Sequence, residues 1–228
     1  MRLALVFVLC ASVAMAADLP EQRFKRAQTL AQEGQFDEAA TEYLDLVAAE
    51  PKGELAPKAL HDAAACYESA QRFDLAEKID SRLVNEYPTS KLADVALFRA
   101  ALNAEKLLAF DKPIERYEKL VKNYPTSAGR ENALSSIARL LEDTQRYAEA
   151  AVACVRYADA YPKSLDASRH QLRAAQLYER EAEPSAELAV LKAYVKKFGS
   201  RAGQDELTRV KQRVAVLEKQ APDAGVER

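Results

Sequence analysis

Apolar residues along the chain recur three and four positions apart, with charged and polar residues between them. One such stretch places Leu97, Ala100, Ala101 and Ala104 at this spacing. Residues three and four apart share one face of an α-helix, so the pattern predicts helices that each have one apolar face. Stretches of about 14 residues with this pattern alternate with short polar turns. The sequence therefore predicts an all-α chain built from helix pairs within residues 17–200.

The helical pattern itself repeats every 37 residues. A column of small residues follows this period without a break: Ala27, Ala64, Ala101, Ala138 and Ala175. Small side chains at the same place in every unit allow two helices to pack closely. One amphipathic helix pair cannot bury its apolar faces alone, so neighbouring units are expected to stack and share one elongated core.

Proline separates the units from one another. The four boundary prolines are also 37 residues apart: Pro51, Pro88, Pro125 and Pro162. Proline lacks an amide donor and disfavours helical geometry in the residue before it, so we expect each second helix to end at that residue. Three boundaries read Tyr-Pro-x-Ser, and the serines are predicted to cap the next helix: Ser90, Ser127 and Ser164. Residues after each proline are predicted to lengthen that helix by about one turn.

The order of these positions resembles the tetratricopeptide repeat, which runs through small and aromatic residues to a closing proline. The second unit shows that order with Leu60, Ala64, Tyr67, Ala76 and Pro88. The resemblance covers five copies, and their period is three residues longer than the usual 34. It implies a right-handed superhelical solenoid of about five helix-turn-helix repeats within residues 17–200.

Beyond the repeats, apolar residues again recur three and four positions apart. They are interleaved with basic residues: Leu207, Val210, Val214 and Leu217. This pattern predicts a helix within residues 201–220 that caps the last unit and covers its apolar face. A partner-binding amphipathic helix is the alternative interpretation. Residues 221–228 are predicted to be a disordered tail.

The first 16 residues have a different pattern. Arg2 precedes an uncharged apolar run at residues 3–13, and Ala-Met-Ala follows at 14–16. These features predict a cleaved signal peptide at residues 1–16, and hence an exported protein of the bacterial periplasm. A lipoprotein signal at Cys10 is the alternative, disfavoured by the bulky residue before the cysteine. The apolar run is shorter than the 18 or more residues a spanning helix needs, so we expect no stable membrane anchor in the mature chain.

Composition and charge exclude several classes of function. The formal net charge is −2, whereas nucleic-acid binding needs a strongly basic surface. The two histidines, His61 and His170, have no second ligand at metal-binding spacing, and six glycines form no phosphate-binding loop. No nucleophile, base and orienting group come together, so we expect no catalytic residue, no metal and no cofactor. Cys66 and Cys154 are predicted to be buried and too far apart for a disulfide.

The resemblance also implies where partners bind. In tetratricopeptide arrays the first helix of each pair lines the concave face, at fixed offsets from the alanine column. Carried over in phase, the implied partner-binding residues are Lys58, His61, Phe98, Leu102, Asn132, Arg139, Arg169 and Leu172. Phe98 and Leu102 are predicted to form an apolar pocket, and the arginines with Asn132 to hold a carbonyl or carboxylate. The alternatives are that the apolar pair packs on a neighbouring helix and that the arginines are solvated.

The Tyr-Pro-x-Ser repeat looks like that of bacterial envelope proteins. Together with the signal pattern, it predicts a non-enzymatic envelope adaptor that binds a protein or peptide partner on its concave face. One alternative is a structural subunit of an envelope assembly, for outer-membrane assembly, secretion, motility or polysaccharide export, which would use its convex face. The other is a cell-wall glycan-binding protein. Most tyrosines fall in the repeating core columns, which disfavours glycan binding.

Overall fold

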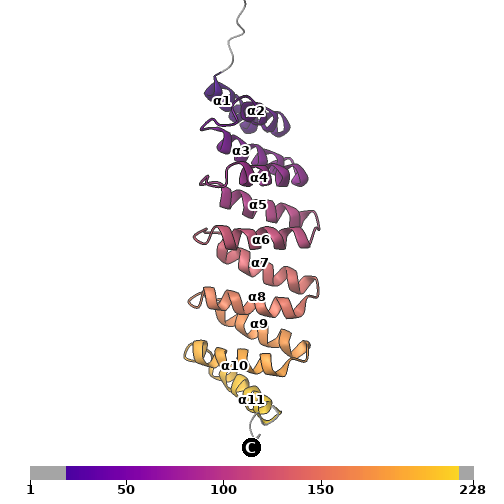
Figure 1. Ribbon diagram of the computed structural model, residues 1–228, viewed down its shortest axis with the longest axis vertical. Helices are drawn as coiled ribbons and strands as arrows, with labels where there is room; N and C mark the ends of the chain where they lie inside the picture. The colour runs from indigo at the N-terminus through magenta and orange to yellow at the C-terminus, as the bar shows by residue number, and fades with distance from the viewer. Residues whose placement is uncertain (1–18, 221–228) are drawn as a thin grey trace, which may run out of the picture.

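A computed structural model describes residues 19–220, and this part of the chain contains eleven α-helices and no strand. The helices stack in chain order along one long axis (Figure 1). Their bounds are α1 Pro20–Gln32, α2 Phe36–Ala49, α3 Ala56–Ser69, α4 Phe73–Glu86, α5 Ala93–Lys106, α6 Asp111–Asn123, α7 Arg130–Asp143, α8 Tyr147–Ala160, α9 Ala167–Arg180, α10 Pro184–Phe198 and α11 Gln204–Gln220. The prediction of an all-α repeat solenoid is confirmed. The predicted signal peptide and tail lie outside the described residues.

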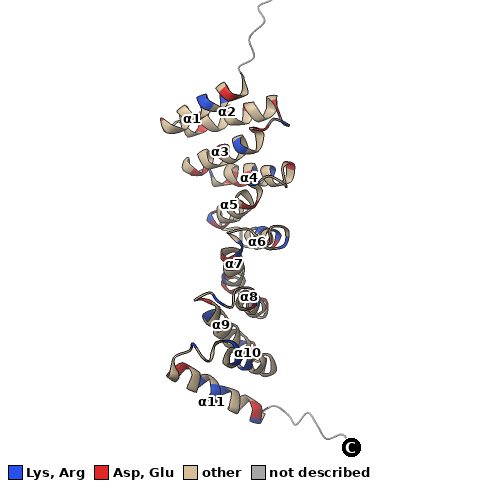
Figure 2. Cartoon of the chain, turned by 90° about the vertical axis from the view of Figure 1, so that its left-hand side faces the viewer, with Lys and Arg blue, Asp and Glu red and all other residues tan. Residues whose placement is uncertain are grey.

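The stack of helices is curved. Figure 2 shows the first helices of the pairs, α1, α3, α5, α7 and α9, along the concave side, and the second helices along the convex side. The principal helix contacts are all between helices successive in the chain. Each unit is therefore supported by its immediate neighbours alone, as in other repeat arrays. Within residues 19–220 no helix is long and apolar enough to cross a membrane.

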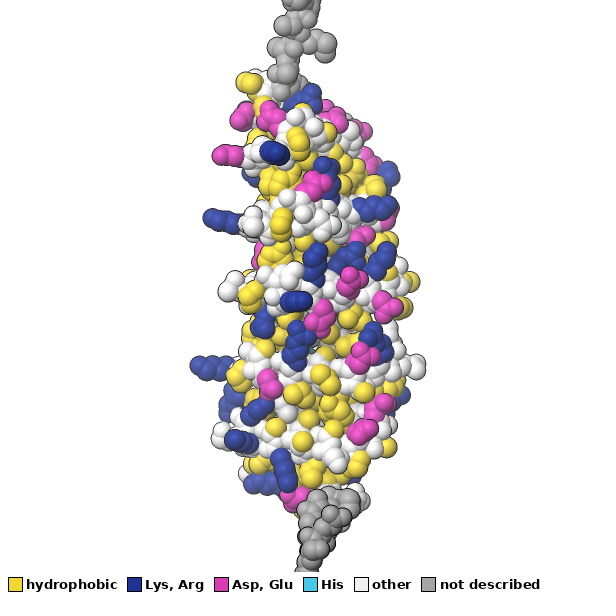
Figure 3. All heavy atoms as spheres, in the orientation of Figure 1, with side chains coloured by type: hydrophobic (Ala, Val, Ile, Leu, Met, Phe, Trp, Pro, Cys, Tyr) yellow, Lys and Arg dark blue, Asp and Glu magenta, His cyan; other side chains and the backbone are white. Residues whose placement is uncertain are grey.

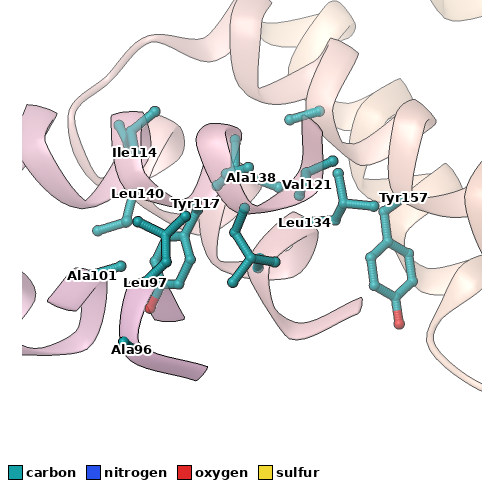
Figure 4. Close-up of a cluster of buried hydrophobic side chains, with 14 of the residues drawn as sticks. Ala96, Leu97, Ala101, Ile114, Tyr117, Val121, Leu134, Ala138, Leu140 and Tyr157 are labelled. Atoms are coloured by element: carbon teal, nitrogen blue, oxygen red, sulfur yellow. The ribbon is translucent and has the colours of Figure 1, made fainter. Parts of the chain in front are cut away.

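The repeating apolar columns form the core. Every member of the alanine column is buried, from Ala27 at 0% exposure to Ala175 at 4%. Figure 4 shows the core where α5, α6, α7 and α8 meet, with Leu97, Tyr117 and Leu134 from three successive helices. The alanines allow close approach of the helices, and the larger side chains fill the space between units. Cys66 and Cys154 are buried and free, as predicted.

The second helices end where the prolines predict. Their C-terminal caps are the residues before proline, and these residues leave helical geometry with ψ of 72°, 57°, 66° and 55°: Glu50, Tyr87, Tyr124 and Tyr161. The tyrosine of this motif also joins units. Tyr124 donates its hydroxyl to the Pro88 carbonyl at 3.1 Å, and Tyr87 donates to the Pro51 carbonyl. The motif therefore ends one helix and holds the end of the preceding unit.

The prediction that serine caps the following helix is wrong. Ser127 Oγ accepts the Gly129 amide at 3.2 Å, whereas α7 begins only at Arg130 with no side-chain cap. Ser90 makes the same contact with the Leu92 amide. The residues after Pro88, Pro125 and Pro162 form turns closed by the serine, so they do not lengthen the next helix either. The longer period places the serine too far from the helix start to reach its free amides.

The turns inside the units share a backbone feature that the sequence analysis missed. One residue per turn has a left-handed backbone, with φ between 55° and 81°: Gly34, Gln71, Leu108, Gln145 and Ala182. The next amide reaches back to the first helix, as from Arg146 N to Leu141 O at 2.8 Å. This is the Schellman arrangement, which favours glycine at the left-handed position. Only the first unit has glycine there. The other four units carry a side chain at this position, so their backbone is strained.

Candidate partner-binding face

The structure places the eight predicted partner-binding residues on the odd-numbered helices, with differing exposure. Five are exposed: Lys58, Leu102, Asn132, Arg139 and Arg169. Three are half-buried: His61, Phe98 and Leu172. Figure 2 shows that their helices line the concave side, so the exposed residues form a mixed polar face on a rigid support. We call this surface the concave face.

Phe98 belongs to the junction between two units. Its ring centroid lies 5.5 Å from that of Tyr117 on α6. The ring also lies against Gly129, where an added Cβ atom would be 3.2 Å from it. The glycine therefore makes room for the ring. Phe98 packs on its neighbours, which was the alternative interpretation, and Leu102 is left as the exposed apolar residue of the predicted pair.

One glutamate in each of units two to five has its carboxylate paired with a basic side chain from the next unit or from α11. We call this row the carboxylate ladder. Its members are Glu68 with Lys106, Glu105 with Arg139, Glu142 with Arg173, and Glu179 with Arg213. The Lys106 pair is 2.7 Å long and the Arg213 pair 3.1 Å. Hydrogen bonds from Arg173 lower the pKa of Glu142 below its usual value.

The carboxylate ladder changes the interpretation of Arg139. Its guanidinium contacts Glu105 on α5 and Asp143 on its own helix, so both neighbours already compensate its charge. Arg169 likewise contacts Asp166 at 2.9 Å. Exposed pairs of this kind contribute about 0–1 kcal/mol each. A partner carboxylate can therefore displace the acidic side chains from these arginines at small energetic cost. The charges on the concave face are paired, so the face has no strong potential of one sign.

His61 is tied to a buried ion pair. Arg99 on α5 donates to both carboxylate oxygens of Asp80 on α4, at 2.7 and 2.6 Å, and to the His61 carbonyl at 2.8 Å. Asp80 is fully buried. Burial, together with the charge of Arg99, lowers the pKa of His61 to about 4. His61 therefore sits in a structural network that joins α3, α4 and α5, and its ring is neutral at pH 7.

Leu172 lies in a cleft that the sequence analysis did not predict. The cleft has a volume of about 430 Å³ and lies between α9, α10 and α11. Glu187 on its floor is almost fully buried and accepts two hydrogen bonds from Arg213, at 2.6 and 2.9 Å. Arg209 and Val210 line the side formed by α11. The cleft forms only once α11 packs on α10, so repeat phase alone could not locate it.

Side chains of metal-binding and nucleophilic types also occur among the described residues. Within residues 19–220, no group of three histidine, cysteine, aspartate or glutamate side chains is placed to hold a metal ion. Burial raises the pKa of the Cys66 thiol to about 11, which favours its unreactive protonated form. His170 stacks on Tyr157 with centroids 3.9 Å apart, and its Nε2 lies 3.2 Å from Ser135 Oγ.

Comparison with known sequences gives one family. Residues 95–127, which run from α5 to the boundary after α6, match the tetratricopeptide repeat. The matched stretch spans about one repeat unit. No curated protein matches the chain in sequence.

Solved structures share the fold at low sequence identity. A tetratricopeptide repeat protein from Parabacteroides merdae has a TM-score of 0.54 at 14% identity, covering 88% of this chain and 72% of that one. MamA from Desulfovibrio magneticus has a TM-score of 0.51 at 12% identity, covering 82% and 99%. A chain from the structure of Naa15/Naa10 bound to HypK-THB has a TM-score of 0.58 at 14% identity, covering 90% and 30%.

These observations agree with one another. The helix pairs stack in order, one unit matches the repeat in sequence, and the whole stack resembles solved solenoids of that type. Such solenoids provide an extended, curved surface suited to protein–protein interaction. One unit of the chain, residues 95–127, thus matches the tetratricopeptide repeat in sequence, and the described helices together have the fold of solved tetratricopeptide-repeat solenoids.

Proposed function

We propose that this protein is a non-enzymatic adaptor of the bacterial envelope that binds a protein or peptide partner on its concave face. The observation that carries the proposal is the row of exposed side chains on successive first helices, including Leu102, Asn132 and Arg169. Their helices are fixed by a continuous core, so the surface is pre-organised and loses little conformational entropy on binding. An extended peptide or a partner helix fits a curved face of this length.

The location outside the cytoplasm rests on the sequence. Residues 1–16 have the charged start, apolar run and small-residue cleavage pattern of a secretory signal. The Tyr-Pro-x-Ser boundaries resemble those of bacterial envelope proteins. One structural neighbour is a chain from the structure of Naa15/Naa10 bound to HypK-THB. That complex supports a partner-binding use of this architecture.

Partner binding can be tested by site-specific crosslinking. A photoreactive phenylalanine analogue placed at Asn132, which is exposed on α7, is expected to trap a discrete partner in living cells. The same analogue at Glu115, exposed on the convex helix α6, is the matched control. A partner trapped only from Glu115, or from neither position, would contradict the concave-face assignment.

The location needs a separate experiment. The full chain and a version beginning at Asp18 are expressed in a Gram-negative host, and the periplasmic fraction is released by osmotic shock. We expect the full chain in that fraction, with mass spectrometry showing a mature start at Ala17, and the shortened chain in the cytoplasm. An uncleaved full chain in the cytoplasm would refute export without affecting the binding proposal.

A further inference from the structure

The turn between α5 and α6 exposes three large apolar side chains. Leu107, Leu108 and Phe110 are 45%, 76% and 49% exposed. We call these three residues the α5–α6 tip. The turn lies at the side edge of the helix stack (Figure 1), so these side chains can reach another molecule. Clustered exposed apolar side chains on a soluble surface mark interaction sites more often than chance.

The α5–α6 tip is unusual among the five equivalent turns. Other units place Gly34, Gln71, Gln145 or Ala182 where the third unit has Leu108. Leu108 adopts the left-handed backbone with φ of 56°, a conformation that is strained for a bulky side chain. The fold does not require leucine there, because glutamine occupies the same position twice. Strain combined with exposure points to a function for the side chain.

A complementary hollow lies on the convex side. It has a volume of about 820 Å³ between α8 and α10, and we call it the α8–α10 groove. Its apolar lining consists of Val152, Val155, Ala160, Tyr178, Ala186, Ala189 and Val190. Val152 is 58% exposed, so a valine side chain is left partly in water. Figure 3 shows hydrophobic side chains gathered on this side of the molecule over its C-terminal half.

Charges beside the α8–α10 groove are already compensated. Arg156 donates to both carboxylate oxygens of Glu118 at 2.7 Å, and Asp159 pairs with Lys197. The groove therefore favours an uncharged, apolar occupant. The α5–α6 tip has this chemistry, since the charge of Asp111 beside it is likewise paired, with Arg146 at 3.4 Å. One chain thus carries both an apolar protrusion and an apolar hollow.

We propose that the α5–α6 tip of one copy docks into the α8–α10 groove of a second copy. The two surfaces differ, so the contact is heterologous and joins copies head to tail. Three apolar side chains in one groove make a small interface, which places the contact in the weak and transient class. The concave face stays free in such an assembly, so self-association and partner binding use opposite surfaces.

The test is the mass of the purified mature chain as a function of concentration, measured by sedimentation velocity from about 10 to 500 µM. The wild-type mass is expected to rise with concentration. Leu108→Gln replaces the most exposed apolar side chain of the tip with the residue found at Gln71 and Gln145. Val152→Glu places a charge in the groove, at the position that Glu115 occupies in α6. Each variant alone is expected to remain a monomer with unchanged helicity by circular dichroism.

Mixing the two variants gives the decisive measurement. Leu108→Gln keeps an intact groove and Val152→Glu keeps an intact tip, so an equimolar mixture is expected to form dimers and nothing larger. Val95→Gln, which changes a valine on α5 that is 50% exposed, is the matched control and should associate like wild type. Mass that is independent of concentration in the wild type, association that survives either variant, or a mixture that stays monomeric overturns the proposal.

A membrane surface is the competing destination for the α5–α6 tip. Co-sedimentation with vesicles of phosphatidylglycerol and phosphatidylethanolamine distinguishes it. Vesicle binding that is lost in Leu108→Gln, by a wild-type protein that remains monomeric, would assign the tip to lipid and overturn self-association.

Discussion

His61 illustrates how one half-buried side chain makes stability depend on pH. Its pKa is about 4 in the folded chain, against 6.5 when unfolded. Burial disfavours the charged ring most, and the positive charge of Arg99 adds to this effect. Below pH 6.5 the unfolded chain therefore binds a proton that the folded chain resists. The contribution of the neutral His61 ring to the free energy of unfolding is fully present above pH 6.5 and is lost as pH falls through about 4. We expect this loss to be about 1–2 kcal/mol, since the ring is partly exposed.

The measurement is urea unfolding of the parent and of His61→Gln at a series of pH values from 7.5 to about 4. The variant is expected to gain stability relative to the parent as pH falls. Burial raises the pKa of Asp80 to about 6, which gives the opposite dependence, but this group is present in both proteins and cancels in the difference. A difference that stays constant over this range would refute the assignment.

The left-handed turn position predicts a stabilising substitution. Gln145 has φ of 61° and an exposed side chain, whereas Gly34 holds the same place in the first unit without strain. Gln145→Gly removes about 1–2 kcal/mol of strain and costs about 0.5–1 kcal/mol of additional chain entropy in the unfolded state. We expect a net gain of up to about 1 kcal/mol, measured as a shift in the urea midpoint. Gln145→Ala, which keeps the strain, should leave the midpoint unchanged.

At the scale of helices, the buried pair of Asp80 and Arg99 joins three elements. Equivalent positions in units one and three carry Tyr43 and Tyr117, so the core does not need a charge there. Arg99→Leu leaves the Asp80 carboxyl buried without its partner and is expected to cost about 3–5 kcal/mol. Asp80→Leu combined with Arg99→Leu should recover most of that loss, because both charges are then gone. Urea unfolding of the two single variants and the double variant completes the cycle, and simple additivity would contradict this account.

Helix positions could be predicted from the sequence because they depend on local rules that repeat. The alanine column and the residues before proline fixed the core face and the helix ends, and the structure agrees at Ala138 and Tyr124. The role of Ser127 could not be predicted, because it depends on where the following helix begins. A shift of a few residues changes a helix cap into a separate turn.

The concave face was less predictable for a related reason. The glutamates of the carboxylate ladder share one repeat phase, so they can be found from the sequence. Their basic partners do not, because Lys106, Arg139 and Arg173 stand at different places in their units. Long flexible side chains reach a carboxylate from several positions, so a phase analysis cannot identify these pairs. The sequence leaves open whether Phe98 lines a pocket or packs on a neighbouring helix, because the space beside Gly129 is defined only in three dimensions.

At the scale of the described stack, the principal contacts join successive helices, and the ion pairs of the carboxylate ladder reach only the next unit, so stability is close to a sum of local contributions. Helix α11 then protects mainly what it touches. It buries Val210 and Leu217, and Glu206 accepts a hydrogen bond from Tyr194 on α10. Ending the chain at Gly203 exposes the apolar face of α10, and we expect faster amide exchange in α9 and α10, by about 10- to 100-fold. Exchange in α1 to α4 should not change.

Hydrogen exchange read by mass spectrometry resolves these segments, and a chain ending at Gln220 is the control that keeps α11 intact. A graded loss, greatest in α10 and fading within one or two units, would identify the array as a series of coupled pairs. Equal acceleration in every helix would instead mean that the units unfold as one cooperative body. In that case substitutions anywhere in the stack would alter the concave face, and local tests of binding could not be separated from stability.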